Sequence, residues 1–98
     1  MTRQRKASAQ TVTVLVELAN NSGQWLHGYA ISTATGLKSG TLYPVLMRLK
    51  ESGYLESRWE ASPPAGRPPR HLYRITAAGL RYLAATDDDQ VSTSAATR

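Results

Sequence analysis

The chain has 98 residues and no cysteine, and its 12 Lys and Arg exceed its 7 Asp and Glu to give a net charge of +5. The lack of cysteine excludes disulfides, thiolate metal sites and a cysteine nucleophile, and it favours a reducing, cytoplasmic location. The sequence has no apolar run long enough for a membrane span, and residues 1–10 lack the apolar stretch of a secretory signal. We therefore expect no membrane association.

The positive charge is concentrated in the part of the chain that we expect to fold. Outside residues 87–98 there are 11 basic and 4 acidic side chains, a net charge of +7. Such a charge attracts polyanions such as nucleic acid, although it also serves solubility alone. We divide the chain into a basic flexible arm at residues 1–7, one domain at residues 8–86 and a disordered polar tail at residues 87–98.

An apolar helix is expected at residues 8–20. Its β-branched residues would also suit a strand, but the run is too long for a typical strand. The apolar residues form two stripes, whereas a surface helix needs one. We therefore expect the second stripe, which contains Val14 and Leu18, to contact another subunit.

A short helix and a tight turn are expected next. Residues 21–25 form a loop that Trp25 anchors on the core, and residues 26–35 form a helix that ends at Gly36. A second helix follows the turn at residues 36–38. This order is the outline of a helix-turn-helix.

The helix after this turn is the centre of our interpretation. Its buried stripe should consist of four residues at three- and four-residue steps: Leu42, Val45, Leu46 and Leu49. We expect Ser39 or Thr41 to cap its first turn and Gly53 to end it in the left-handed conformation. Pro44 fits best with Thr41 as the cap, because it is then the third helical residue and costs no hydrogen bond. With Ser39 as the cap, a slight kink should follow.

A β-hairpin is expected after this helix, because the apolar period changes to an alternation. Residues 55–60 and 71–75 should be strands that pair around the proline-rich turn at residues 61–70. Trp59 alternates inward with Leu55, so we expect its indole in the core or in an interface.

A last helix should be capped by Thr76 and end near Ala85, because the aspartates at 87–89 would oppose the dipole at its end. Its apolar residues include Leu80 and Leu83. The predicted fold is mainly α with a small β-hairpin. It is a winged helix-turn-helix with three helices, a two-stranded wing and a C-terminal helix.

Two motifs form a specific combination, Ser39-Gly40-Thr41-Leu42-Tyr43-Pro44 and Gly66-Arg67-Pro68-Pro69-Arg70. With shorter matches over about residues 12–85, they make the chain similar to the PadR family of bacterial transcriptional regulators. The resemblance implies a homodimer that binds a roughly palindromic operator in double-stranded DNA. Such a protein is usually a repressor, released by an inducer that is either a small molecule or a partner protein.

We expect DNA contacts from the second helix of the helix-turn-helix, by its N-terminal end, and the resemblance implies further contacts from the wing. The candidate DNA-binding residues are Lys38, Ser39, Gly40, Thr41, Tyr43, Pro44, Arg48, Arg67 and Arg70. Members of the family commonly dimerise through a longer C-terminal helix, so here we expect the first and last helices to share this role. The candidate dimer-interface residues are Val14, Leu18, Leu80 and Leu83.

The sequence contains no catalytic Ser/His/Asp arrangement and no cluster of metal ligands, so we expect no enzymatic activity, no metal and no cofactor. The alternative function is a winged helix that binds a protein partner and has no operator of its own. Salt separates the two functions, because a DNA binder loses affinity steeply as salt rises.

Overall fold

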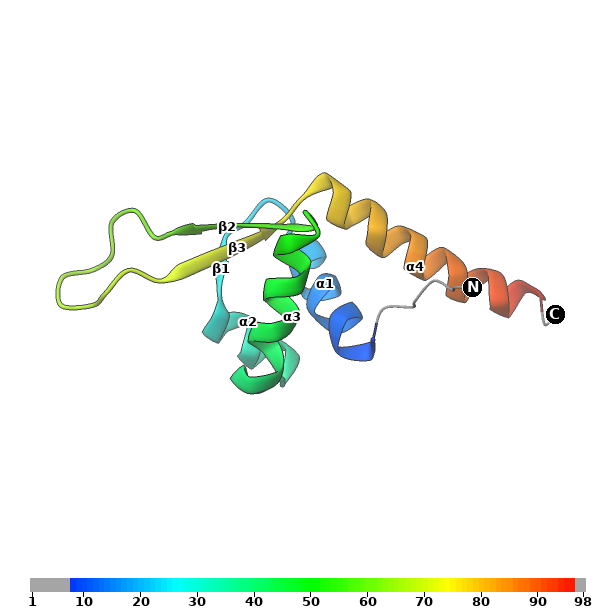
Figure 1. Cartoon of the computed structure of the whole chain (residues 1–98), viewed down its shortest axis with the longest axis horizontal. Coiled ribbons are helices and arrows are strands. Elements are labelled where there is room, and N and C mark those ends of the chain that lie inside the picture. The colour runs from blue at the N-terminus through cyan, green and yellow to red at the C-terminus, as the bar shows by residue number, and fades with distance from the viewer. Residues whose placement is uncertain (1–7, 97–98) are drawn as a thin grey trace.

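The computed structural model describes residues 8–96 of the chain, with side chains described for residues 8–86. The expected basic arm at residues 1–7 lies outside the described residues. Figure 1 shows the arrangement of the helices and strands. In chain order they are α1 (Ala9–Asn20), β1 (Leu26–His27), α2 (Gly28–Thr35), α3 (Ser39–Glu51), β2 (Leu55–Trp59), β3 (His71–Ile75) and α4 (Ala77–Ala96).

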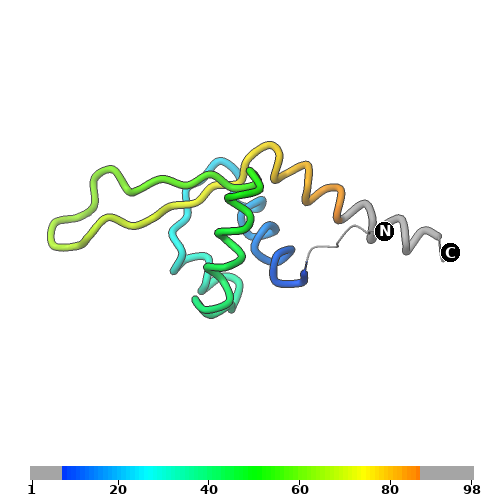
Figure 2. The backbone as a smooth tube through the Cα atoms, viewed as in Figure 1, coloured from blue at the N-terminus to red at the C-terminus, as the bar shows by residue number. Residues whose placement is uncertain are grey.

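The strands form one antiparallel sheet in the order β1-β3-β2. The β2–β3 hairpin confirms the expected wing, and its register pairs Leu55 with Ile75 at one end and Trp59 with His71 at the other. The hairpin and its long turn extend away from the helices (Figure 2). β1 was not predicted, and the expected helix at residues 26–35 begins only at Gly28. A two-residue strand has no alternating pattern of its own and is defined only by its pairing with β3.

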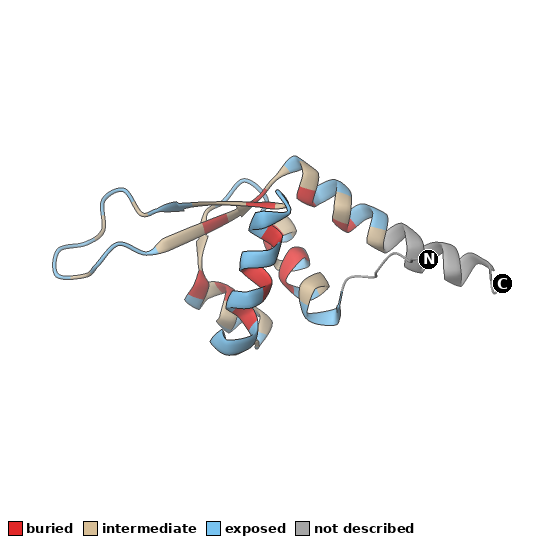
Figure 3. Ribbon diagram, in the orientation of Figure 1, coloured by how far each residue is buried: buried red, intermediate tan, exposed pale blue. Residues whose placement is uncertain are grey.

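One apolar core joins the helices to the sheet (Figure 3). The expected stripe of α3 is confirmed, since all four of its residues are buried. Val14 and Leu18 are also buried, at 0% and 1% exposure, so the prediction that they contact another subunit is wrong. The reason is that α1 packs against α2, α3, α4 and β3 within one chain, and the stripe that contains Val14 and Leu18 is used there.

The last helix is longer than predicted. α4 continues to Ala96, so its expected end near Ala85 is wrong, and the last residues of the expected polar tail, 97–98, lie outside the described residues. The dipole argument failed because it acts only within the last turn of a helix, and the aspartates at 87–89 lie in the middle of α4. Thr76 caps the helix as predicted, because its Oγ1 accepts a hydrogen bond from the backbone N of Gly79 at 3.0 Å.

Local contacts fix α2 and the turn that leads to α3. His27 is the N-cap of α2, and its Nδ1 accepts a hydrogen bond from the backbone N of Ala30 at 3.1 Å. The helix ends at Gly36 as predicted, and the backbone of Gly36 is in the left-handed conformation, with φ 77°. Ser32 then donates its hydroxyl to the carbonyl of Leu37 at 2.6 Å, which ties the turn to α2. The start of α3 is therefore held by hydrogen bonds on α2.

Candidate nucleic-acid interface

The first turn of α3 has no side-chain cap. The N-cap is Lys38, whose backbone is extended, and its carbonyl accepts hydrogen bonds from the backbone N of Thr41 and of Leu42 at 2.9 and 2.8 Å. The prediction of a cap at Ser39 or Thr41 is wrong, because both are already helical residues, and a capping residue lies outside the helix. The N–H groups of Ser39 and Gly40 therefore remain open, with no acidic residue in the first turn. Such a helix end favours an anion.

Pro44 lies deeper in α3 than either predicted position, because the helix starts at Ser39 and Pro44 is its sixth residue. At this depth the missing N–H removes the hydrogen bond to the carbonyl of Gly40. Both residues are exposed, so water or a bound partner can satisfy that carbonyl. The N-terminal half of α3 thus presents unpaired backbone donors and one unpaired acceptor at the surface.

Tyr43 is half-exposed, at 42%, and its ring lies against α2. A Cβ atom at Gly28 would stand only 2.7 Å from Cζ of Tyr43 and would overlap its hydroxyl. The hydroxyl and the adjoining ring edge therefore pack on the first residue of α2, while the residue as a whole stays partly exposed. This contact sets the position of Tyr43.

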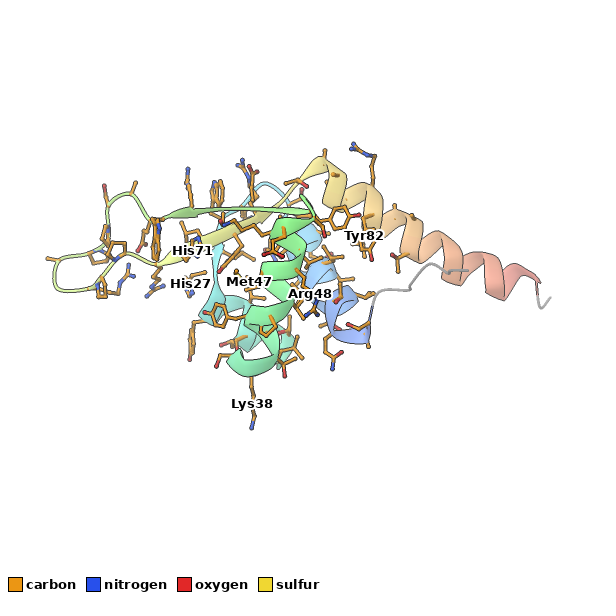
Figure 4. All side chains as sticks on the ribbon, in the orientation of Figure 1. His27, Lys38, Met47, Arg48, His71 and Tyr82 are labelled. Carbon is orange, nitrogen blue, oxygen red and sulfur yellow. The ribbon has the colours of Figure 1, made fainter. Side chains whose placement is uncertain are left out.

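The other candidate residues of α3 lie on its exposed side: Lys38, Ser39, Gly40, Thr41, Pro44 and Arg48. Figure 4 shows Lys38 at the N-terminal end of the helix, Met47 on the side that faces the wing, and Arg48 on the side of α1. Within residues 8–86 the ion pairs are Arg67–Glu60 and Arg74–Glu56, so the cations of α3 take part in none. The surface of α3 is therefore positively charged.

Arg67 and Arg70 differ in the wing. The Arg67 guanidinium lies 3.0 Å from the Glu60 carboxylate, and the same carboxylate accepts a hydrogen bond from the backbone N of Arg70 at 3.3 Å. The hydrogen bond from Arg67 lowers the pKa of the Glu60 carboxyl. The Arg70 side chain is exposed, so it is more accessible to DNA than the Arg67 side chain, which pairs with Glu60. This arrangement was not predictable from a local pattern, because residues 61–66 of the proline-rich turn lie between Glu60 and Arg67.

Both tryptophans differ from the sequence-based expectation. Trp59 is 64% exposed, so its prediction as a core residue is wrong, whereas the alternative of an interface residue stays a prediction. It lies beyond the end of the core, where His71 alone stacks on it at 4.7 Å between ring centroids. Trp25 does not insert into the core but lies beneath the guanidiniums of Arg58 and Arg74, at 4.3 and 4.4 Å from its ring centroid.

Among the residues that the structure describes, no three His, Asp or Glu side chains gather in a way that could hold a metal ion. No helix found there combines the length and hydropathy that a membrane crossing requires. The candidate site consists of the exposed groups of α3 and the wing.

Solved structures with the same fold are numerous, whereas no curated protein matches the chain. A PadR family transcription regulator from Clostridium difficile R20291 superposes with a TM-score of 0.75 at 19% identity, over 91% of this chain and 94% of that one. A PadR-like transcription factor from Bacteroides fragilis gives 0.72 at 23% identity, over 89% and 84%. A PadR family transcriptional regulator from Eggerthella lenta DSM 2243 gives 0.69 at 29% identity, over 86% and 76%.

The family model of the PadR-like transcriptional regulators matches residues 14–85, which run from within α1 to the first half of α4. The match spans most of the chain, and the solved structures agree with it in fold. The chain belongs to the PadR-like family of transcriptional regulators, and it is a DNA-binding regulator and not an enzyme.

Proposed function

We propose that the protein is a repressor that binds a palindromic operator as a homodimer. The observation that carries this proposal is the first turn of α3, which is exposed, uncapped and free of acidic side chains. A helix end of this kind suits a phosphate at the edge of the major groove, and the residues that follow it can then meet base edges.

The candidate residues take different roles in this proposal. The open N–H groups of Ser39 and Gly40, with the Lys38 ammonium, bind phosphate and fix the register of α3. Thr41 and the outward part of Tyr43 meet base edges, with Pro44 beside them. Arg48, with Arg70 and Arg67 of the wing, contacts the backbone of the flanking DNA.

The homodimer is supported by apolar side chains that the chain leaves exposed. Val16 on α1 and Leu80 on α4 are each 39% exposed, and α1 packs against α4. Leu83 is 8% exposed and belongs to the core, so Leu80 is the one predicted interface residue that points outward. Two copies of α3 would engage half-sites about one DNA turn, roughly 34 Å, apart. We propose that such a regulator acts in the cytoplasm. We also propose that an inducer, either a small molecule or a partner protein, releases it from DNA.

Selection of duplexes from a randomised library, long enough for two half-sites, tests the proposal. The wild-type protein should enrich one palindromic sequence and bind it tightly in the presence of random competitor DNA. The affinity should fall steeply with salt, because each phosphate contact releases counterions. Repression is then measured from a reporter gene that carries the selected sequence in its promoter.

The alternative gives the opposite result. A winged helix that serves a protein partner would bind all duplexes weakly and equally, and no sequence would be enriched. Its supporting observation is the exposed Tyr29, whose side chain is 76% exposed on α2. Enrichment of a sequence without a palindrome would support DNA recognition but contradict the symmetric dimer.

A further inference from the structure

The wing exposes a large aromatic side chain close to the proposed DNA surface. Trp59 ends β2 and is 64% exposed, while Met47 on the neighbouring side of α3 is 51% exposed. Large apolar groups that gather on the surface of a small domain mark interaction sites. Trp59 needs an explanation, because no part of the described chain covers it.

One face of the Trp59 indole packs against another aromatic ring of the hairpin. It stacks on the His71 ring with a centroid distance of 4.7 Å and an interplanar angle of 17°. His71 in turn has its Nδ1 at 3.2 Å from the hydroxyl of Tyr73, which is 4% exposed and belongs to the core. An aromatic ring that is already fixed loses little conformational entropy on binding. Trp59 is therefore a rigid surface and not a mobile side chain.

A continuous aromatic row connects this ring to α3. The register pairs Trp59 with His71 and Ser57 with Tyr73, so these side chains share the face of the sheet on which Leu55 is buried. Burial raises the pKa of Tyr73, and the nearby phenol of Tyr43 raises it further. Tyr43 packs on Gly28, and the two residues before Gly28 form β1, which pairs with β3 at Tyr73, so Tyr43 lies at the α3 end of the row. The aromatic row Tyr43, Tyr73, His71 and Trp59 runs from the proposed DNA-reading helix out to the wing.

The opposite face of the wing carries the charge. Arg58 and Arg74 both lie over Trp25 on that face, and Arg74 also pairs with Glu56 at 2.7 Å. By the same alternation, Arg70 belongs to the charged face. The aromatic row contains no cation, so a partner bound there is held by apolar contact and not by ion pairing.

We propose that Trp59 is a second, non-ionic DNA contact, in which its indole packs against a deoxyribose of the duplex that α3 engages. The inference rests on the proposed function. DNA is favoured over a protein partner because the aromatic row leads to the exposed side of α3, and because the same hairpin carries Arg67 and Arg70 in its turn. The CH face of a deoxyribose is apolar and lies between two phosphates, so a wing with an aromatic ring on one face and cations on the other matches it.

Salt dependence separates this contact from an ionic one. Trp59→Ala should weaken binding to the library-selected duplex by roughly tenfold, as expected for the loss of one aromatic stacking contact, and should leave the salt slope unchanged. Trp59→Phe should retain most of the affinity. The matched control is Arg70→Ala on the other face, which should flatten the slope by about 0.9. Unchanged affinity of Trp59→Ala would overturn the proposal, and so would a flattened slope.

Fluorescence tests the contact without removing it. In a Trp25→Phe variant the remaining emission comes from Trp59, and the selected duplex should protect it from a soluble quencher. Equal quenching with and without DNA would contradict the contact, even if Trp59→Ala failed to fold. If Trp59→Ala instead converted the DNA-free protein from a dimer to a monomer, as measured by its sedimentation, the ring would belong to an interface between subunits. This result would also overturn the proposal. If the wild type enriched no sequence at all, the proposed function itself would fail.

Discussion

Gly28 controls Tyr43 at the scale of single residues. A methyl group at position 28 would collide with the Tyr43 phenol, whose outer part can swing into solvent, so Gly28→Ala should displace Tyr43 while it changes the thermal midpoint little. We expect operator affinity to fall about fivefold, or ~1 kcal/mol. The measurement is a double-mutant cycle: in a Tyr43→Ala background, Gly28→Ala should cause no further loss. Additive losses would show that Gly28 acts through another contact.

His27 links the capping of α2 to pH. Burial lowers the pKa of its imidazole below the ordinary 6.5, and the positive charges of Arg70 and Arg67 lower it further. On acidification, the unfolded chain therefore binds this proton at a higher pH than the folded protein does. The contribution of His27 to the free energy of unfolding should be complete above about pH 6.5 and should decrease as the pH falls below it. Protonation also removes the Nδ1 acceptor of the cap.

Thermal unfolding of the wild type and of His27→Asn at neutral pH and at about pH 5 measures this linkage. Asn is a good N-cap and does not titrate, so the variant should lose less stability on acidification. The pKa of the Glu60 carboxyl is also lowered, so its contribution to stability is lost only below the ordinary pKa of 4.5. That loss lies outside the range between neutral pH and about pH 5. The same pH dependence in both proteins would exclude His27 as its source.

At the scale of elements, the wing is held by an ion pair that competes with DNA. The Glu60 carboxylate binds the Arg67 guanidinium and the backbone N of Arg70. Glu60→Gln removes a negative charge and releases Arg67, so we expect tighter binding at low salt and a salt slope steeper by about one phosphate contact. A salt titration with the selected duplex measures both quantities. Weaker binding by Glu60→Gln would mean that the ion pair orients the wing for contact.

Elements were predictable from the sequence where one local rule decided them. The four-residue stripe of α3, the cap at Thr76 and the end of α2 at Gly36 each follow from spacing within one or two turns. Features that depend on tertiary position were not predictable. The alternation of β2 gives the face on which Trp59 lies, but only the end of the core decides that this ring is exposed. Likewise, the pattern of α1 shows two apolar stripes but not that one chain buries Val14 and Leu18.

At the scale of the whole molecule, the proposed DNA-binding surface and the proposed dimer interface lie on different sides. The reading helix and the aromatic row lie on the side of α3 and the wing, whereas α4 begins at the end of the sheet opposite the wing tip (Figure 1). Tyr82 of α4 stacks on Tyr54 at 4.3 Å, and Gly79 closely approaches the Tyr54 carbonyl, so the start of α4 is fixed to the core. A dimer through α4 would therefore hold two reading helices at a defined spacing, which is what a palindromic operator requires.

Leu80 tests this arrangement, because it is exposed on α4 while Leu83 beside it is buried. The wild type should sediment at twice its chain mass of 10.7 kDa. Leu80→Glu places a charge in the proposed interface and should yield a folded monomer that binds a single half-site, with a loss of operator affinity at low protein concentration. The matched control is Arg81→Glu, a neighbouring exposed position, which should leave the dimer intact. A Leu80→Glu protein that stays dimeric would place the interface elsewhere, and a monomeric wild type with full operator affinity would contradict the symmetric dimer itself.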